Sequence, residues 1–263
     1  MKAVLVWWLL AMPAGAETLR LALSTSVENS GLAGVLIASY EAATGDEVRA
    51  IIAGSGRGLA LGAAGDVDAV ISHAPELESA AVASGSFSHR AAFMFNDFVL
   101  IGPEDDPAGI SGAASAAEAF ARLRAAQARF LSRGDESGTH EAEKRLWLAS
   151  GAVPRSASGR WYLETGTGMG ATLNTAVALG GYTISDRATW ASFANKRGHR
   201  IVFEGDPALF NQYAFLPVSG EKHPFVASAA AARFEAWLLG DGQSVIEAFE
   251  IAGVRLFTPN ARD

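Results

Sequence analysis

The chain has 263 residues, of which 49% are apolar and 19% charged, and its formal net charge is −7. This composition excludes a disordered chain, and the length allows one large domain or two smaller ones. The negative charge argues against a nucleic-acid partner, and the absence of cysteine excludes disulfides, thiolate catalysis and the acylated cysteine of a lipoprotein.

Residues 1–16 have the pattern of a secretory signal peptide. Lys2 precedes an apolar run from Ala3 to Met12, and Ala14-Gly15-Ala16 forms an A-x-A cleavage site. The apolar run is too short to span a bilayer. We therefore predict cleavage after Ala16, export to the periplasm of a Gram-negative cell, and no membrane insertion of the mature chain.

The first predicted strand, Thr18–Leu23, runs into three consecutive hydroxyl residues. Ser24, Thr25 and Ser26 follow the strand, and a helix is predicted from there up to Thr44-Gly45. A single Ser or Thr is enough to cap a helix. Three in succession favour a turn that binds an anion, because the first backbone N–H groups of a helix have no acceptor within it.

Two more strand-to-helix turns follow. The predicted strand Val48–Ala53 enters Gly54-Ser55-Gly56, where the glycines let the backbone approach a ligand closely. The short strand Asp68–Ser72 leads to His73 and a helix over Pro75–Ser84. A lone histidine such as His73 is more often a hydrogen-bonded structural residue than a ligand-binding one.

The stretch Ala91–Gly102 is a long apolar strand interrupted by Asn96-Asp97. Polar residues inside such a run indicate a place where the strand changes partners. We therefore predict a crossover between two domains here. A helix over Ala113–Ala128 and a strand over Arg129–Leu131 are predicted next.

The segment SRGDESGTH, Ser132 to His140, is the most informative part of the chain. Arg133 is a permanent cation four residues before Ser137-Gly138-Thr139, and a helix is predicted over Glu141–Ser150. Small hydroxyl residues at a helix start, together with the planar fork of a guanidinium, predict a site for a small oxyanion.

A purely structural role for the same segment carries about equal weight on its own. Ser137 or Thr139 would then only cap the helix, and Arg133 would only pair with Asp135 or Glu136. The similar turns elsewhere in the chain favour the anion site.

The rest of the chain continues the alternation of strands and helices. The turn Thr165–Gly170 opens a helix up to Leu179 and matches a dinucleotide fingerprint, which we reject because a lone match is weak and the chain is predicted to be exported. The remaining predicted elements are strands over Gly181–Ile184, Ile201–Glu204 and Tyr213–Val218, a helix over Asp186–Asn195, and two helices within Pro224–Val254 broken at Gly240-Asp241-Gly242. Ile201–Glu204 is taken as the return crossover. The pattern predicts an α/β protein with mainly parallel sheets.

These motifs together resemble the periplasmic tungstate-binding proteins of ABC transporters, in the class of type II periplasmic binding proteins. The resemblance rests on LSTS from Leu23, NSGL from Asn29, GSGRGLALG from Gly54, ISHAP from Ile71, FNDFVLIGPEDDPAGI from Phe95, SRGDESGTH, WYLETGTGMGATLN from Trp161 and YTISDRATW from Tyr182. It implies two α/β lobes joined by two crossover strands, with the ligand in the cleft between them. Lobe I is predicted to comprise residues 17–95 and 200–263, and lobe II residues 96–199. One departure is Leu23, which stands where the family has the first hydroxyl residue of this turn.

The resemblance also bears on the choice of anion. Phosphate-binding proteins of the same class have an acidic residue that accepts the remaining proton of the phosphate. The matching turn here, Ser72 to Pro75, holds no carboxylate. We therefore expect a fully deprotonated dianion, tungstate above all, with molybdate, sulfate or phosphate as alternatives.

Our hypothesis is that eight residues donate hydrogen bonds to this dianion: Ser24, Thr25, Ser26 and Ser55 from lobe I, and Arg133, Ser137, Gly138 and Thr139 from lobe II. The expected protein is a monomer without cofactor or metal cation, is not an enzyme, and delivers its ligand to a membrane permease. A sensor that docks to a signalling partner remains open. A secreted serine hydrolase using Ser55 or Ser137 is a weaker alternative, because no G-x-S-x-G elbow is present.

Overall fold

The computed structural model describes residues 17–261, apart from the side chains of residues 155 and 156. The predicted signal peptide and its cleavage site lie outside the described residues. Within the described part of the chain, no helix has both the length and the apolar character needed to cross a membrane.

Three parallel strands build the sheet of lobe I. β1 (Thr18–Leu23) lies between β2 (Glu47–Ile52) and β3 (Ala69–Ser72). The helices that follow these strands are α1 (Thr25–Asn29), α2 (Leu32–Thr44), α3 (Ser55–Ala64) and α4 (Pro75–Ala83). Because the strands are parallel, their carboxyl ends share one edge of the sheet, and the turns that begin after them lie together there.

Lobe II repeats this arrangement with shorter strands. β5 (Phe130–Ser132) pairs in parallel with β6 (Tyr162–Glu164), and a bridge from Phe130 to Tyr182 brings in β7 (Thr183–Asp186). The helices of this lobe are α5 (Ala116–Ala125), α6 (Gly138–Ala149), α7 (Met169–Leu179) and α8 (Arg187–Ser192), with short 3-10 turns at Ile110–Gly112, Pro154–Ala157 and Pro207–Leu209. SRGDESGTH therefore runs from the carboxyl end of β5 into α6.

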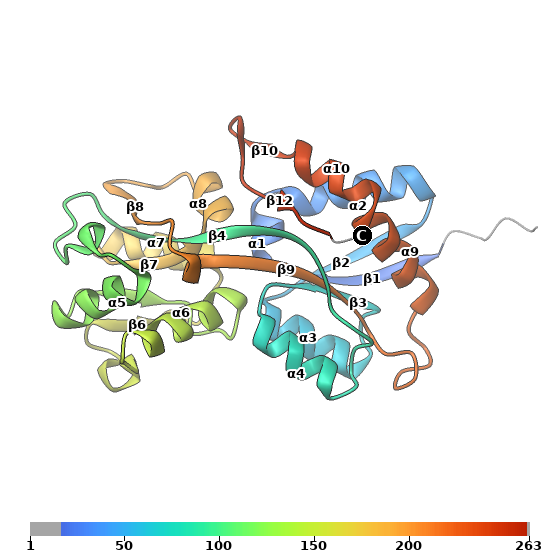
Figure 1. The fold of residues 1–263 in the computed structure, drawn as a ribbon, viewed down its shortest axis with the longest axis horizontal. Helices are drawn as coiled ribbons and strands as arrows, with labels where there is room; N and C mark the ends of the chain where they lie inside the picture. The colour runs from blue at the N-terminus through green and yellow to red at the C-terminus, as the bar shows by residue number, and fades with distance from the viewer. Residues whose placement is uncertain (1–16, 262–263) are drawn as a thin grey trace, which may run out of the picture.

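Two long strands run between the lobes (Figure 1). β4 (Ala91–Pro103) pairs with β9 (Phe210–Pro217) up to Asp97, and from Phe98 onward with β7 and with β8 (His199–Phe203). The predicted change of partner at Asn96-Asp97 is therefore confirmed. These long strands make antiparallel pairs, so the main sheet is mixed, and the expectation of mainly parallel sheets holds only for the inner strands of each lobe.

The return crossover was predicted at Ile201–Glu204, and this assignment is wrong. β8 pairs only with the lobe II end of β4, whereas β9 pairs with both β4 and β3. Val202 and Leu209 pack in the core of lobe II. The exact lobe boundaries remain a prediction, and these contacts favour starting the second segment of lobe I at Phe210 rather than at Arg200.

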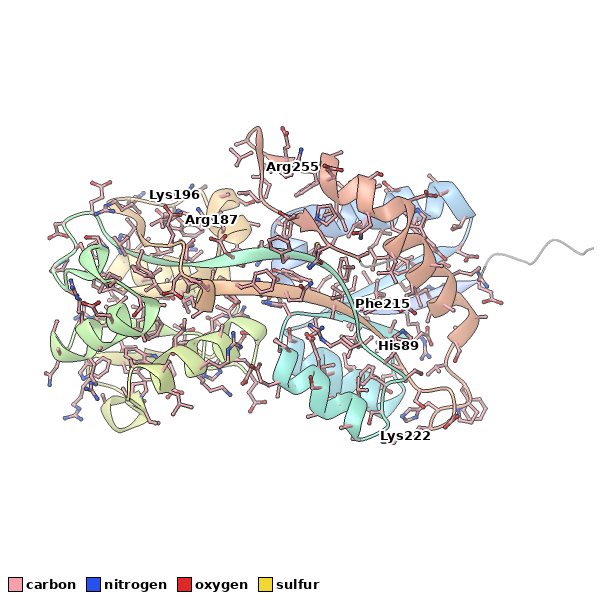
Figure 2. All side chains as sticks on the ribbon, in the orientation of Figure 1. His89, Arg187, Lys196, Phe215, Lys222 and Arg255 are labelled. Carbon is pink, nitrogen blue, oxygen red and sulfur yellow. The ribbon has the colours of Figure 1, made fainter. Side chains whose placement is uncertain are left out.

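Each lobe has its own apolar core. In lobe I, β1, α2 and the C-terminal helix α9 (Ser228–Leu239) enclose Tyr40, Phe215 and Phe234, and Phe215 lies on β9 (Figure 2). In lobe II, Phe120, Phe130 and Trp147 pack edge to face around the sheet. The chain ends with α10 (Asp241–Ala248) and three two-residue strands, β10 (Glu250–Ile251), β11 (Val254–Arg255) and β12 (Thr258–Pro259).

The core of lobe II contains the buried carboxyl group of Glu143. Its Oε1 accepts hydrogen bonds from the Tyr162 hydroxyl at 2.8 Å and from the Trp147 indole at 3.2 Å, and burial raises its pKa to about 7. The folded protein therefore binds a proton more strongly than the unfolded chain, whose reference pKa is 4.5. Stability from this group is fully present below pH 4.5 and is lost as the pH rises through about 7.

We therefore expect the free energy of unfolding to fall between pH 5 and pH 8 by more in the native protein than in Glu143→Gln. The expected difference is on the order of 3 kcal/mol, since each unit of pKa shift corresponds to about 1.4 kcal/mol. Urea denaturation of both proteins at the two pH values measures it, and using the variant as reference removes the contribution of other groups. Parallel pH dependence in the two proteins would contradict the assignment.

Candidate functional site

The hydroxyl turn after β1 lies buried at the edge of the lobe I sheet. Ser24 and Ser26 are 1% and 2% exposed, and their Oγ atoms are 3.1 Å apart. Ser55, the first residue of α3, is also buried, and its Oγ accepts a hydrogen bond from the backbone N–H of His73 at 3.3 Å. Four of the predicted residues, Thr25 included, thus come from two neighbouring turns of this edge.

On the lobe II side, Arg133 is almost completely buried at the end of β5. Its side chain is 3% exposed, and Nη2 donates to Asp135 Oδ2 at 2.5 Å. Nε points at the carbonyl oxygen of Thr167 at 3.4 Å, so the glycine-rich turn that opens α7 lies beside the guanidinium. A buried guanidinium with a single carboxylate partner retains donors for a second anion.

Ser137 and Thr139 occupy the start of α6. The Ser137 hydroxyl accepts from the His140 N–H at 3.3 Å and donates to Asp135 Oδ1 at 2.6 Å. Thr139 Oγ1 is fully buried and has no hydrogen-bond partner within residues 17–261. Because Ser137 satisfies the amides of His140 and Glu141, the amides of Gly138 and Thr139 are those left by the helix for another acceptor.

Both structural alternatives raised by the sequence are therefore present: Ser137 caps α6, and Arg133 pairs with Asp135. They do not exhaust the donors, because the guanidinium has five N–H groups and the cap engages the amide of His140 but leaves those of Gly138 and Thr139.

The two groups of turns face each other across the lobes. The N–H of Gly56 donates to the carbonyl oxygen of Glu136 at 3.3 Å, and Arg133 Nη1 lies 3.5 Å from Thr25 Oγ1. A Cβ added at Gly138 would lie 2.7 Å from both the carbonyl oxygen and Nε2 of His73. All eight predicted residues thus belong to turns that meet at one interlobe junction.

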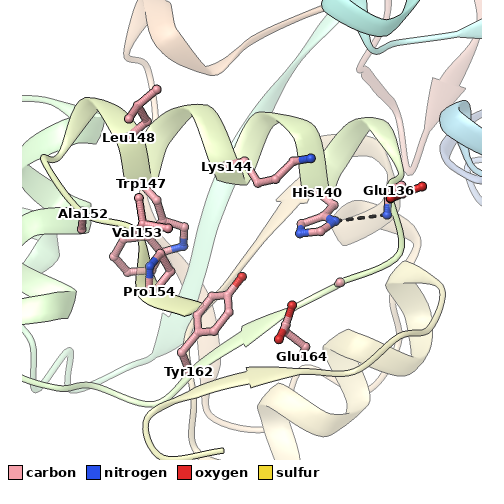
Figure 3. Close-up of a pocket in the computed structure, with 11 residues that line it drawn as sticks. Glu136, His140, Lys144, Trp147, Leu148, Ala152, Val153, Pro154, Tyr162 and Glu164 are labelled. Atoms are coloured by element: carbon pink, nitrogen blue, oxygen red, sulfur yellow. Dashed lines mark hydrogen bonds between the residues drawn. The ribbon is translucent and has the colours of Figure 1, made fainter. Parts of the chain in front are cut away.

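A cavity of about 410 Å³ lies beside α6 (Figure 3). Trp147 and Tyr162 form part of its wall, and none of the eight predicted residues lines it. His140 links the two regions, since its Nδ1 accepts the N–H of Glu136 at 3.1 Å. The cavity therefore adjoins the junction at Glu136 but is not lined by the predicted ligand-binding residues.

The sequence missed three buried residues behind the junction, Asp186, Tyr213 and Asn211. Asp135, which the sequence named as a possible partner of Arg133, also accepts from Ser137, so a carboxylate lies beside the predicted donors although the Ser72–Pro75 turn has none. Asp186, at the start of α8, is 1% exposed, and burial raises its pKa while the nearby charge of Arg133 opposes the rise. Tyr213 and Asn211 reach the site from β9, and no local pattern in the sequence marks them.

The geometry does not support a serine nucleophile. Within the described residues, the Oγ of Ser55 contacts the backbone of His73 rather than its ring, and the Oγ of Ser137 contacts Asp135 and the backbone of His140. A hydrolase would need a base within hydrogen-bond reach of the nucleophile.

Comparison with known proteins decides the family. Residues 12–241 match the model of the PBP superfamily domain, the periplasmic binding proteins. The chain belongs to this superfamily. As a periplasmic binding protein it is a solute-binding protein and not an enzyme.

Similar periplasmic binding proteins include the tungstate-binding protein TupA of Peptoclostridium acidaminophilum, which is 37% identical over 246 residues covering 92% of this chain and 85% of that protein. The solved structure of the tungstate-binding protein TupA from Desulfovibrio alaskensis G20 is 41% identical, covers 94% of this chain and 100% of that chain, and has a TM-score of 0.78. The tungstate ABC transporter structure from Geobacter sulfurreducens is 40% identical, covers 88% of this chain and 98% of that chain, and has a TM-score of 0.79. The predicted family and its type II fold are thereby confirmed.

Proposed function

We propose that this chain is the periplasmic binding protein of an ABC transporter, that it captures tungstate between its lobes, and that it delivers the ion to the membrane permease. In this proposal the mature chain begins after Ala16 and acts as a monomer that does not insert into the membrane. The observation that carries the proposal is the buried guanidinium of Arg133, which faces the hydroxyl turn of the other lobe at 3.5 Å. The proposal is also supported by the similar proteins described above, which are named as tungstate-binding proteins.

The proposed shell consists of Ser24, Thr25, Ser26 and Ser55 from lobe I and Arg133, Ser137, Gly138 and Thr139 from lobe II. The Ser137 hydroxyl donates to Asp135 in this structure and would have to turn from it to the ion. A charge-assisted hydrogen bond contributes roughly 1.5–3 kcal/mol, and association costs roughly 4–15 kcal/mol. Seven or so donors then support micromolar to nanomolar affinity. The turns of the two lobes complete the shell only when the lobes are closed, and closure replaces the hydration of the ion with fixed donors.

A thermal-shift panel on the mature protein tests the proposal. A ligand that binds the folded state raises stability in proportion to the logarithm of its excess over the dissociation constant. We expect tungstate to raise the melting temperature most, molybdate to follow, and phosphate to have little effect, each measured against sodium chloride at equal ionic strength. No shift with any tetrahedral oxyanion, or a larger shift with phosphate than with tungstate, would contradict the proposal.

A further inference from the structure

A chain of buried hydrogen bonds runs from the crossover strands to the hydroxyl turn. Asn96 on β4 and Asn211 on β9 are directly opposite each other. The side-chain amide nitrogen of Asn211 donates to Asn96 Oδ1 at 2.6 Å and to the Tyr213 hydroxyl at 3.2 Å. Both protons of this amide are therefore used.

The remaining atom of the Asn211 amide fixes the tautomer of His73. Asn211 Oδ1 lies 2.9 Å from His73 Nδ1, and because an amide oxygen can only accept, Nδ1 carries the proton. The ring is neutral, because burial and, to a lesser extent, the charges of Arg133 and Arg145 lower its pKa to about 4, although the hydrogen bond to Asn211 and the charge of Asp135 oppose the shift. Nε2 is then a bare acceptor, 3.4 Å from Ser26 Oγ.

The same chain directs the hydroxyl protons of the turn. The Tyr213 hydroxyl accepts from Asn211 and therefore donates its own proton to Ser26 Oγ at 3.0 Å. Ser26 Oγ lies 3.1 Å from Ser24 Oγ and 3.4 Å from His73 Nε2, and the shorter contact favours donation of the Ser26 proton to Ser24. The His73 ring stacks on Tyr213 with centroids 4.8 Å apart, which holds both rings in place.

We propose that His73 and Asn211 are positioning residues for the interlobe site: His73 locks the Asn211 amide, and the amide sets a one-way series of hydrogen bonds through Tyr213 and Ser26 that leaves the Ser24 hydroxyl free to point outward as a donor. This inference rests on the proposed function and deepens it. Donors aligned in one direction polarise one another. They suit an oxyanion that carries no proton of its own, because such a ligand only accepts.

The first test is the tautomer of His73 in the ligand-free protein. Nitrogen-15 NMR of the imidazole at pH 7 is expected to show a protonated Nδ1 and a bare Nε2. The opposite tautomer would contradict the proposed series of hydrogen bonds, because the Asn211 side chain would then have to present its amide nitrogen to the His73 ring.

The second test is a double-mutant cycle on tungstate affinity, measured by calorimetry. Tyr213→Phe keeps the ring stack and removes the donor to Ser26, and we expect it to weaken binding about fivefold. In the Ser26→Ala background, Tyr213→Phe should weaken tungstate binding by less than about a further twofold, because the hydrogen bonds from Tyr213 act through Ser26. His73→Phe should behave in the same way.

The results of these tests distinguish the proposed tungstate binding from the positioning role of His73 and Asn211. A full, additive effect of Tyr213→Phe in the Ser26→Ala background would mean a merely structural role and would overturn the inference. If the native protein binds neither tungstate, molybdate nor sulfate, the proposed function fails and the positioning role fails with it. If it binds tungstate but His73 carries its proton on Nε2, only the inference fails.

Discussion

Replacing Arg133 by alanine is expected to weaken tungstate binding by about 2 kcal/mol or more, at least roughly thirtyfold. Arg133 is the one permanently charged residue of the proposed shell, and its side chain is 3% exposed. Removing it leaves the dianion without a counter-charge and also leaves Asp135 as an unpaired carboxylate beside the ion. Isothermal titration calorimetry with tungstate measures the effect, and Arg133→Lys should recover only part of the affinity because the planar fork is lost.

Arg145→Ala is the matched control. Arg145 also bridges the lobes, through an ion pair with Glu76 at 3.3 Å, but the two side chains are 38% and 57% exposed. An exposed pair contributes at most about 1 kcal/mol. Unchanged tungstate affinity in Arg133→Ala, or an equal loss in Arg145→Ala, would contradict the assigned role of Arg133.

Gly138→Ala is expected to weaken tungstate binding at least tenfold without removing a single donor, because it prevents full closure. The added Cβ would lie 2.7 Å from the backbone oxygen of His73 in the opposite lobe. A backbone atom cannot rotate away, so the lobes would have to stay apart. Calorimetry measures the loss, and small-angle X-ray scattering with saturating tungstate should give a larger radius of gyration than the liganded native protein.

Gly170→Ala tests whether any alanine at a helix start has this effect. Gly170 lies in the first turn of α7, and a Cβ there meets nothing within 4 Å. We expect near-native affinity from this variant. Gly56→Ala should behave like Gly138→Ala, since its Cβ would lie 2.7 Å from the carbonyl oxygen of Glu136. Native affinity in Gly138→Ala would mean that the bound state is not this closed arrangement.

Local patterns in the sequence predicted most elements of the fold. β1, α2, α3 and α6 follow from apolar periodicity and from glycines such as Gly45, which adopts the left-handed conformation at φ 77°. The polar pair Asn96-Asp97 predicted the change of partner in β4, and the structure supplies the reason: Asn96 bonds to Asn211, and Asp97 pairs with Arg187 at 2.6 Å.

The pairing of strands that are far apart along the chain could not be predicted from the sequence. An alternating segment such as Ile201–Glu204 looks the same whether it joins one lobe or links two, so the return crossover was assigned to β8 instead of β9. The contacts behind the site have the same character. Asn211 is 138 residues from His73, and Tyr213 is 187 residues from Ser26. Residues that become neighbours only through β9 leave no local signal.

A crystal structure of the mature protein with tungstate shows whether turns from two lobes jointly hold one dianion. Anomalous scattering from tungsten locates the ion without assumptions about the protein. We expect a single strong peak between the starts of α1 and α3 and the start of α6, within hydrogen-bond distance of the Arg133 guanidinium. A peak in the cavity beside Trp147 and Tyr162, or one that contacts only one lobe, would contradict it.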